Sequence, residues 1–194
     1  MGRTSRESSR KQVDSGPNFD GRIRDMTIRI PFHVPTVTGT ESDRVTAACS
    51  DPHALQSDGP YSAICSKLLQ NHLKAENILF TPSCTAALEI AAMLAVKPGD
   101  EVIVPSFTFV TSVSAFTNLG AKPVFCDIRE DTLNIDESKI PGLITPRTKA
   151  IVAVHYGGIS CAMDEISAIA KDRGIFVIED AAQALSGKYK DQAL

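Results

Sequence analysis

Three short segments carry the side chains with which this sequence could bind a ligand. The first is the run Thr81-Pro82-Ser83-Cys84-Thr85-Ala86-Ala87, which leads directly into an Ala-rich helical pattern. The first N–H groups of a helix have no partners within the helix and lie at the positive end of its dipole, so a phosphate could bind there. Thr85 adds a hydroxyl donor, and the N–H groups of Thr85 and Ala86 would point outward. An ordinary Ser or Thr helix cap gives the same pattern and stays open as the alternative.

The second segment places two aromatic rings after an apolar strand pattern. It reads Val104-Pro105-Ser106-Phe107-Thr108-Phe109, and one of its rings could cover a planar ligand. Burial of both rings in the core is the alternative, because phenylalanine is usually buried.

The third segment delivers a carboxylate at the end of another apolar run, Ile178-Glu179-Asp180-Ala181-Ala182-Gln183. A carboxylate at such a place is costly unless it meets a cation. A protonated pyridine nitrogen is such a cation, and Asp180 beside it would keep it protonated. If the chain turns helically, Gln183 lies on the same face and brings an amide near a ring hydroxyl. A carboxylate that merely caps the following turn is the alternative.

Taken in chain order, the three segments offer a phosphate seat, a ring cover and a partner for a pyridine nitrogen. Each follows a predicted strand of one sheet. Together they describe a site for pyridoxal 5'-phosphate.

The elements that must position these segments form an α/β pattern. From Asn77 onward, short β-branched runs alternate with helical runs, and Gly or Pro separates them. Strands are predicted over residues 77–81, 101–104, 122–128, 149–155 and 175–179, and helices over residues 40–50, 60–75, 84–96, 108–119, 136–144 and 163–173. Most of the strands are apolar throughout, which is typical of strands covered on both faces. The pattern predicts a doubly wound, mostly parallel sheet with ligand chemistry at the carboxyl ends of its strands.

Composition excludes several classes of function. The formal net charge of -3 and the sequence pI of about 5.8 give no basic field for nucleic acid or an anionic membrane. Five scattered cysteines and four isolated histidines show neither a disulfide framework nor the spacing of a metal site. No run approaches the roughly 18 to 20 apolar residues of a membrane span, and we expect a cytoplasmic protein without a membrane partner. Residues 1–27, rich in Arg, Ser and Asp, are predicted to be a disordered extension.

From about Ile28 to Leu194 the sequence resembles the DegT/DnrJ/EryC1/StrS sugar aminotransferases, which belong to fold type I of the pyridoxal-phosphate enzymes. The segments that carry the resemblance are the three above together with Ile30-Pro31-Phe32, Pro98-Gly99-Asp100-Glu101 and Val154-His155-Tyr156-Gly157-Gly158. The resemblance implies that residues 28–194 are the N-terminal part of the large domain of such an enzyme, with an incomplete sheet. Within the family, Ser83-Cys84-Thr85 and the run Asp131-Thr132-Leu133-Asn134-Ile135-Asp136 are similar to the subgroup that aminates C4 of a dTDP-4-keto-6-deoxyhexose, as in the dTDP-fucosamine pathway.

The resemblance also implies the roles of site residues and the partners. Thr85 and Ala86 would bind the phosphate, Phe109 would stack on the pyridine ring, Asp180 would pair with the ring nitrogen, and Gln183 would meet the phenolic oxygen. His155 and Tyr156 lie beside the site without an assigned role. The implied partners are a nucleotide-sugar substrate and an amino-acid donor, most commonly L-glutamate, and the implied assembly is a homodimer with shared active sites.

The family's Schiff-base lysine has no counterpart in the sequence, and the resemblance implies that it would lie beyond Leu194. Lys188 and Lys190 follow Asp180, but they resemble a strand and turn that lead away from the cofactor. We therefore assign no catalytic residue within the chain. A truncated, catalytically inactive fragment or pseudoenzyme is the alternative hypothesis. A nicotinamide-dependent Rossmann enzyme is disfavoured because no G-x-G-x-x-G follows the first predicted strand.

Overall fold

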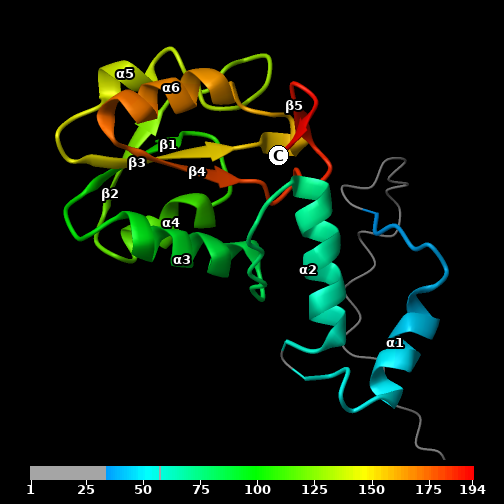
Figure 1. Cartoon of the computed structure of the whole chain (residues 1–194). Coiled ribbons are helices and arrows are strands. Elements are labelled where there is room, and N and C mark those ends of the chain that lie inside the picture. Colours follow the sequence, from blue (N-terminus) through cyan, green and yellow to red (C-terminus); the bar gives the residue numbers. More distant parts are fainter. Residues whose placement is uncertain (1–33, 57) are drawn as a thin grey trace, which may run out of the picture. The chain divides into compact units, whose positions relative to one another are not determined.

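The computed structural model of the chain describes residues 34–56 and 58–194 (Figure 1). The described residues belong to two units, which divide between Ser50 and Asp51. The extension predicted over residues 1–27 lies outside the described residues. Within the first unit, α1 (Glu41–Ser50) confirms the helix predicted over residues 40–50. It begins where the carboxylate of Glu41 accepts hydrogen bonds from the backbone and hydroxyl of Thr38.

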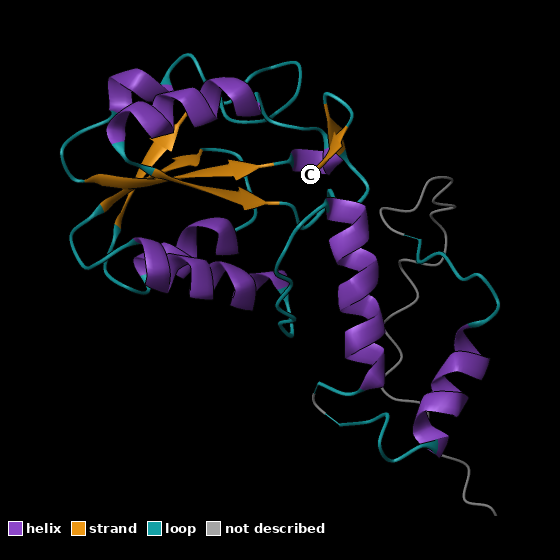
Figure 2. Ribbon diagram, viewed as in Figure 1, coloured by secondary structure: helices purple, strands orange, loops and turns teal. Residues whose placement is uncertain are grey.

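A four-stranded parallel sheet forms the centre of the second unit (Figure 2). Its strands are β1 (Glu101–Pro105), β2 (Lys122–Cys126), β3 (Thr148–Val154) and β4 (Phe176–Asp180), and their order is β2-β1-β3-β4. All three strand pairs are parallel. The α/β prediction is therefore confirmed, and four of the five predicted strands form within two residues of their expected limits.

Helices cover both faces of this sheet, as expected for a doubly wound fold. In Figure 1, α3 (Cys84–Ala95) and α4 (Thr111–Thr117) lie on one face, and α5 (Ile140–Leu143) and α6 (Met163–Arg173) lie on the other. From β1 the chain continues to β2, which is the neighbour of β1 on one edge, and then crosses back to β3, the neighbour of β1 on its other edge. The carboxyl ends of β1 and β3 thus flank the topological switch point, where open α/β sheets bind their ligands.

The core has two layers because the central strands are buried on both faces. One buried cluster, on the α3 and α4 side, includes Val152 and Phe116. The other, on the α6 side, includes Ile151 and Ile166. Successive residues of β3 point to opposite faces, so both layers need apolar side chains from one strand.

One predicted strand is wrong. Residues 77–81 are an extended coil, with Leu79 85% exposed and Phe80 52% exposed. A strand requires a hydrogen-bonding neighbour, and none of the strands in the described part of the chain pairs with this segment. The apolar pattern of the segment was therefore insufficient to establish a strand.

The helix predicted over residues 108–119 was too long, since only Thr111–Thr117 form α4. Two further helix predictions were too long for identifiable reasons. The helix predicted over residues 136–144 is reduced to α5, because Asp136 accepts hydrogen bonds from the backbone and hydroxyl of Ser138 in a turn. Pro141 then fits only in the first turn of the helix. The helix α2 (Pro60–Leu73) stops before Lys74, whose φ of 55° is left-handed.

The chain after β4 forms a short antiparallel hairpin of β5 (Lys188–Tyr189) and β6 (Gln192–Ala193). Near it, the ring of His72 in α2 lies 3.2 Å from the backbone oxygen of Leu185. No helix in the described ranges has both the length and the apolar composition of a membrane span.

Candidate functional site

The carboxylate of Asp180 lies at the end of β4 and is almost entirely buried, with 6% of the residue exposed. Its Oδ2 accepts a hydrogen bond from the hydroxyl of Ser112 at 2.7 Å. Its Oδ1 accepts from the backbone N–H of Ala182 at 3.2 Å and from the thiol of Cys84 at 3.6 Å.

None of these partners carries a positive charge. Among the residues that the structure describes, no ion pair involves Asp180. A buried carboxylate is costly without a cation, and hydrogen bonds from neutral groups offset only part of that cost. This carboxylate is thus arranged to receive a cationic group from a ligand, and a protonated pyridine nitrogen fits that requirement.

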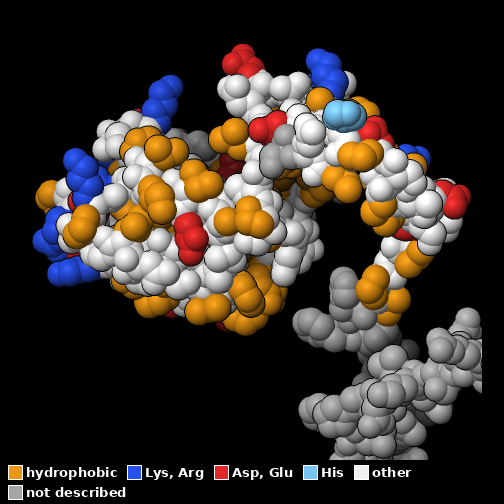
Figure 3. All heavy atoms as spheres, turned by 90° about the horizontal axis from the view of Figure 1, so that it is seen from below, with side chains coloured by type: hydrophobic (Ala, Val, Ile, Leu, Met, Phe, Trp, Pro, Cys, Tyr) orange, Lys and Arg blue, Asp and Glu red, His pale blue; other side chains and the backbone are white. Residues whose placement is uncertain are grey.

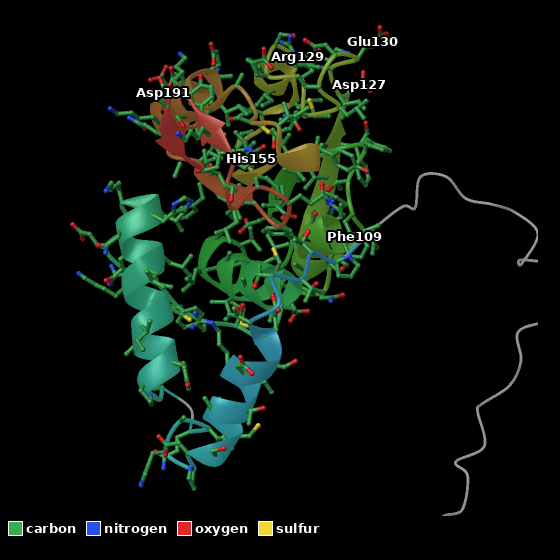
Figure 4. All side chains as sticks on the ribbon, turned by 90° about the vertical axis from the view of Figure 1, so that its right-hand side faces the viewer. Phe109, Asp127, Arg129, Glu130, His155 and Asp191 are labelled. Atoms are coloured by element: carbon green, nitrogen blue, oxygen red, sulfur yellow. The ribbon has the colours of Figure 1, made fainter. Side chains whose placement is uncertain are left out.

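Asp180 shares a small pocket with Phe109 and Gln183, as the sequence predicted for these three residues. The pocket lies at the carboxyl ends of β1, β3 and β4, and its further lining residues are Ser112, Val154, His155, Tyr156 and Ala182. Phe109, in the loop after β1, and His155, directly after β3, are labelled in Figure 4. Phe109 is 67% exposed, so a face of its ring is available to a planar ligand. Phe107 has a different role, since its ring packs against Tyr156 with centroids 4.7 Å apart.

The side chain of Gln183 is oriented by a backbone donor. The N–H of Gly157 donates to its Oε1 at 2.7 Å. Because a backbone N–H can only donate, the carbonyl oxygen of the amide must face it. The NH2 group is left to donate to a ligand, which suits an oxygen such as a ring hydroxyl.

The proposed phosphate turn is a capped helix start. The hydroxyl of Ser83 accepts a hydrogen bond from the N–H of Ala86 at 3.2 Å, so the helix-cap alternative is also observed. A phosphate bound at Ala86 would share this N–H with Ser83 or displace it. Thr85 is half-buried, and its hydroxyl makes no hydrogen bond with the described residues. The turn lies beside Asp180 through the contact of Cys84, but the assignment of Thr85 and Ala86 to a phosphate stays a prediction.

Two of the groups around Asp180 were not predicted from the sequence. Ser112 lies in α4 and Thr108 in the loop that precedes this helix, so a helical spacing of four residues could not have indicated this contact. Cys84 belongs to the predicted phosphate turn itself. Burial and the charge of Asp180 raise the pKa of the Cys84 thiol, so it keeps its proton and acts as a donor.

His155 is buried at the centre of a second network, whose other side chain, Glu179, is partly exposed. Its Nδ1 accepts the backbone N–H of Cys161 at 3.1 Å, which places the ring proton on Nε2. That nitrogen lies 2.9 Å from the Oε2 of Glu179 and donates to it. The backbone N–H of His155 also donates to the oxygen of Asp180 at 3.1 Å. His155 thereby ties the loop after β3 to the end of β4.

The pocket contains no lysine among its described lining residues. Lys190 pairs with Asp164, and Lys188 lines a separate hollow beside α2 with His72. Within the described ranges, no group of three or more His, Cys, Asp and Glu side chains is arranged to hold a metal ion.

Comparison with known proteins decides the family. The model of the DegT/DnrJ/EryC1/StrS aminotransferase family matches residues 36–194. The chain belongs to this family. The chain is 40% identical over 166 residues to the spore coat polysaccharide biosynthesis protein SpsC of Bacillus subtilis. It is 38% identical over 163 residues to the GDP-perosamine synthase of Caulobacter vibrioides.

Solved structures agree with this membership. A putative sugar aminotransferase from Streptococcus pneumoniae, Spr1654, has been solved in a PLP-form and a PMP-form, and it is 33% identical with a TM-score of 0.77. That likeness covers 84% of the chain and 45% of Spr1654. The match to SpsC covers 85% of this chain and 42% of SpsC, and the match to the synthase covers 84% of this chain and 44% of the synthase. The chain therefore spans less than half the length of each relative. The family and the PLP-form structure indicate pyridoxal phosphate as the cofactor, which confirms that prediction.

Proposed function

We propose that this chain forms the cofactor-binding part of an aminotransferase that moves an amino group from L-glutamate to C4 of a dTDP-4-keto-6-deoxyhexose. The observation that carries the proposal is the buried Asp180 carboxylate, which has hydrogen-bond donors but no cation among the described residues. A nucleotide-sugar substrate is supported by relatives whose names contain a nucleotide sugar, such as the GDP-perosamine synthase. The choice of dTDP rests on the resemblance of the turn Ser83-Cys84-Thr85.

Each site residue has a defined task in this proposal. Asp180 accepts a hydrogen bond from the protonated pyridine nitrogen, and Phe109 covers the ring. Gln183 donates its NH2 group to the ring oxygen, while Thr85 and Ala86 hold the phosphate. When bound, pyridoxal phosphate supplies an electron-withdrawing ring that stabilises negative charge next to the transferred nitrogen. The protein residues orient that ring and keep its nitrogen protonated.

The cofactor assignment can be tested with pyridoxamine phosphate, which needs no lysine to bind. We expect the purified chain to bind it saturably, as measured by calorimetry. Asp180→Ala should weaken the binding about tenfold or more, because a hydrogen bond to a charged group contributes about 1.5–3 kcal/mol. Glu130→Gln is the matched control, since Glu130 is exposed, does not line the pocket and lies apart from His155 in Figure 4. Equal binding by the native and Asp180→Ala chains would contradict the proposal.

The absence of lysine from the described pocket lining gives a second test. Treatment with pyridoxal phosphate and borohydride should leave Lys188 and Lys190 unmodified at stoichiometric cofactor, as read by peptide mass spectrometry. A stoichiometric adduct on either lysine would show that the hairpin carries the reactive amine and would overturn this assignment of the pocket.

The substrate is tested separately from the cofactor. The complete aminotransferase, of which this chain would form the cofactor-binding part, is offered glutamate with dTDP-4-keto-6-deoxyglucose, and in parallel with the corresponding GDP and UDP sugars. Formation of the 4-amino sugar with dTDP alone supports the proposal, whereas faster turnover of a GDP or UDP sugar contradicts the choice of nucleotide. A homodimer belongs to the proposal as well, and sedimentation velocity measures it directly.

A further inference from the structure

A chain of hydroxyl groups leads into the carboxylate of Asp180. The hydroxyl of Thr108 lies 3.0 Å from that of Ser112, and Ser112 lies 2.7 Å from the Oδ2 of Asp180. Ser112 is completely buried. An ionised carboxylate can only accept, so Ser112 donates its single proton to Asp180 and accepts from Thr108. The direction of both hydrogen bonds is therefore fixed.

The opposite oxygen of the carboxylate is held just as specifically. The thiol of Cys84 and the N–H of Ala182 both donate to Oδ1. Cys84 lies in α3, Ser112 in α4 and Ala182 in the turn after β4. Donors from three elements thus meet on one side chain, which fixes the rotation of the carboxylate.

The chemical character of these donors matters as much as their number. A lysine or arginine in place of Ser112 would neutralise the charge of Asp180, which would then attract a ligand cation only weakly. A hydroxyl and a thiol stabilise the negative charge without neutralising it. Oδ2 accepts only the Ser112 hydrogen bond among the described residues and retains a lone pair. The arrangement holds the carboxylate oriented for a cation that arrives with the ligand.

We propose that Ser112, supported by Thr108 and opposed by Cys84, is a positioning residue that orients Asp180 for the protonated ring nitrogen of the cofactor. The proposal rests on the function proposed above and deepens it. It assigns the orientation of Asp180, the partner of the ring nitrogen, to the two hydrogen-bonded hydroxyl groups of Ser112 and Thr108, which we call the hydroxyl relay. Ser112 acts through Asp180 and has no catalytic contact of its own.

The decisive variants are Ser112→Thr and Ser112→Val, which have the same shape and differ in the hydroxyl. We expect Ser112→Thr to bind pyridoxamine phosphate within about threefold of the native chain, and Ser112→Val to bind it about tenfold or more weakly, the loss that matches a hydrogen bond to a charged group. Ser114→Val is the control for a β-branched residue in the same helix. Thermal unfolding should give the two Ser112 variants the same melting temperature, so that a difference in binding reflects the hydroxyl group and not stability.

A second ligand separates positioning from general damage to the pocket. The probe is the analogue of pyridoxamine phosphate in which CH replaces the ring nitrogen, so that Asp180 has no proton to accept. With this analogue the native, Ser112→Thr and Ser112→Val chains should bind equally. If Ser112→Val weakens both ligands to the same extent, Ser112 is merely structural and the inference is overturned.

The outcomes also distinguish this inference from the proposed function. Failure of the native chain to bind pyridoxamine phosphate contradicts the cofactor site as a whole. Normal native binding with equal affinities for Ser112→Thr and Ser112→Val contradicts only the role of the relay. Thr108→Val should give a smaller loss than Ser112→Val, because Thr108 touches Asp180 only through Ser112.

Discussion

At the scale of single residues, the site depends on backbone N–H groups that fix the orientation of the Gln183 amide and the position of the proton on the His155 ring. The N–H of Gly157 sets which end of the Gln183 amide faces outward, and the N–H of Cys161 sets which nitrogen of His155 carries the proton. A side chain held in this way loses little entropy when a ligand binds. These backbone donors are therefore important for the fold and for the site at once.

Replacing His155 should show this double role. His155→Ala removes a buried ring and leaves the N–H of Cys161 without an acceptor, and together these effects should cost about 2–4 kcal/mol of unfolding free energy. Urea denaturation measures the loss, and amide exchange of Cys161 should accelerate. His53→Ala, at an exposed position, serves as the control and should change the stability little. A His155→Ala protein as stable as the control would mean that the network contributes nothing to folding.

Glu101 gives a prediction for the dependence of stability on pH. Its buried carboxylate accepts hydrogen bonds from Thr145 and Arg147, and these lower its pKa below the usual range. A carboxyl group whose pKa is lowered by folding stabilises the protein above its unfolded-state pKa, about 4.3. That stability is lost as the pH falls through the lower pKa of the folded state. Stability should therefore decline in acid partly because of Glu101.

The matching variant is Glu101→Gln, which cannot ionise. We expect it to have a lower melting temperature than the native chain at pH 7. The difference should shrink as the pH falls from about 4 through the lower pKa of Glu101 in the folded state, below which both chains carry a neutral side chain. Thermal melts from pH 7 to pH 3 provide the measurement. Glu130→Gln, in an exposed loop, should show no such convergence. A gap between native and Glu101→Gln that stays constant with pH would rule out the ionised carboxylate as its source.

At the scale of elements, helix ends have been specified by single residues. Gly174 ends α6 with a φ of 64°, and its N–H closes the helix onto the oxygens of Ala170 and Lys171. A Cβ built at Gly174 would meet no atom within 4 Å, so only the backbone conformation restricts this position.

Gly174→Ala should therefore cost about 1–2 kcal/mol, the penalty of the left-handed region for a residue with a Cβ. Gly142→Ala is a close control, because a Cβ there also meets nothing within 4 Å and the φ of Gly142 is not in the left-handed region. That control should be neutral or slightly stabilising. Chemical denaturation of the two variants separates the outcomes. Equal stabilities would show that α6 does not need its left-handed end.

The elements that could be predicted from the sequence are those whose pattern depends on their own residues. β1 and β3 were predictable because strands buried on both faces are apolar at every position. The segment 77–81 has the same pattern, yet it is coil, since pairing depends on a neighbouring strand that its own residues cannot specify. The predicted helix over residues 136–144 failed for a local reason, because Asp136 bonds its own following backbone.

At the scale of the whole molecule, the sheet brings together residues that lie far apart in the sequence. The gathering of Phe109, Asp180 and Gln183 in one pocket could be predicted because each lies at or after the carboxyl end of a strand, and parallel strands end at one edge. The contacts of Ser112 and Cys84 with Asp180 depend on how α4 and α3 pack, which strand and helix patterns do not reveal. The phosphate turn stays a prediction because helix capping and anion binding require the same residue types.

The outer face of α3 carries apolar side chains that packing within the second unit does not use. Ile90, Met93 and Leu94 lie three and four residues apart on one helix face, with Met93 65% exposed and Leu94 81% exposed. Figure 3, which views the side covered by α3 and α4, shows hydrophobic side chains over this region. Exposed apolar patches of this kind mark interaction surfaces or sites of association.

We therefore expect the chain to associate at micromolar concentration through this face. The double change Met93→Glu and Leu94→Glu should shift the sedimentation coefficient toward that of the monomer, because burying two charges in a contact is costly. Leu55→Glu, which adds one charge at an exposed apolar residue outside α3, should leave the association unchanged. Equal dissociation by both variants would point to net charge as the cause. A native chain that sediments as a monomer throughout the concentration range would contradict this prediction. The exposed side chains of α3 would then contribute too little free energy to hold two chains together.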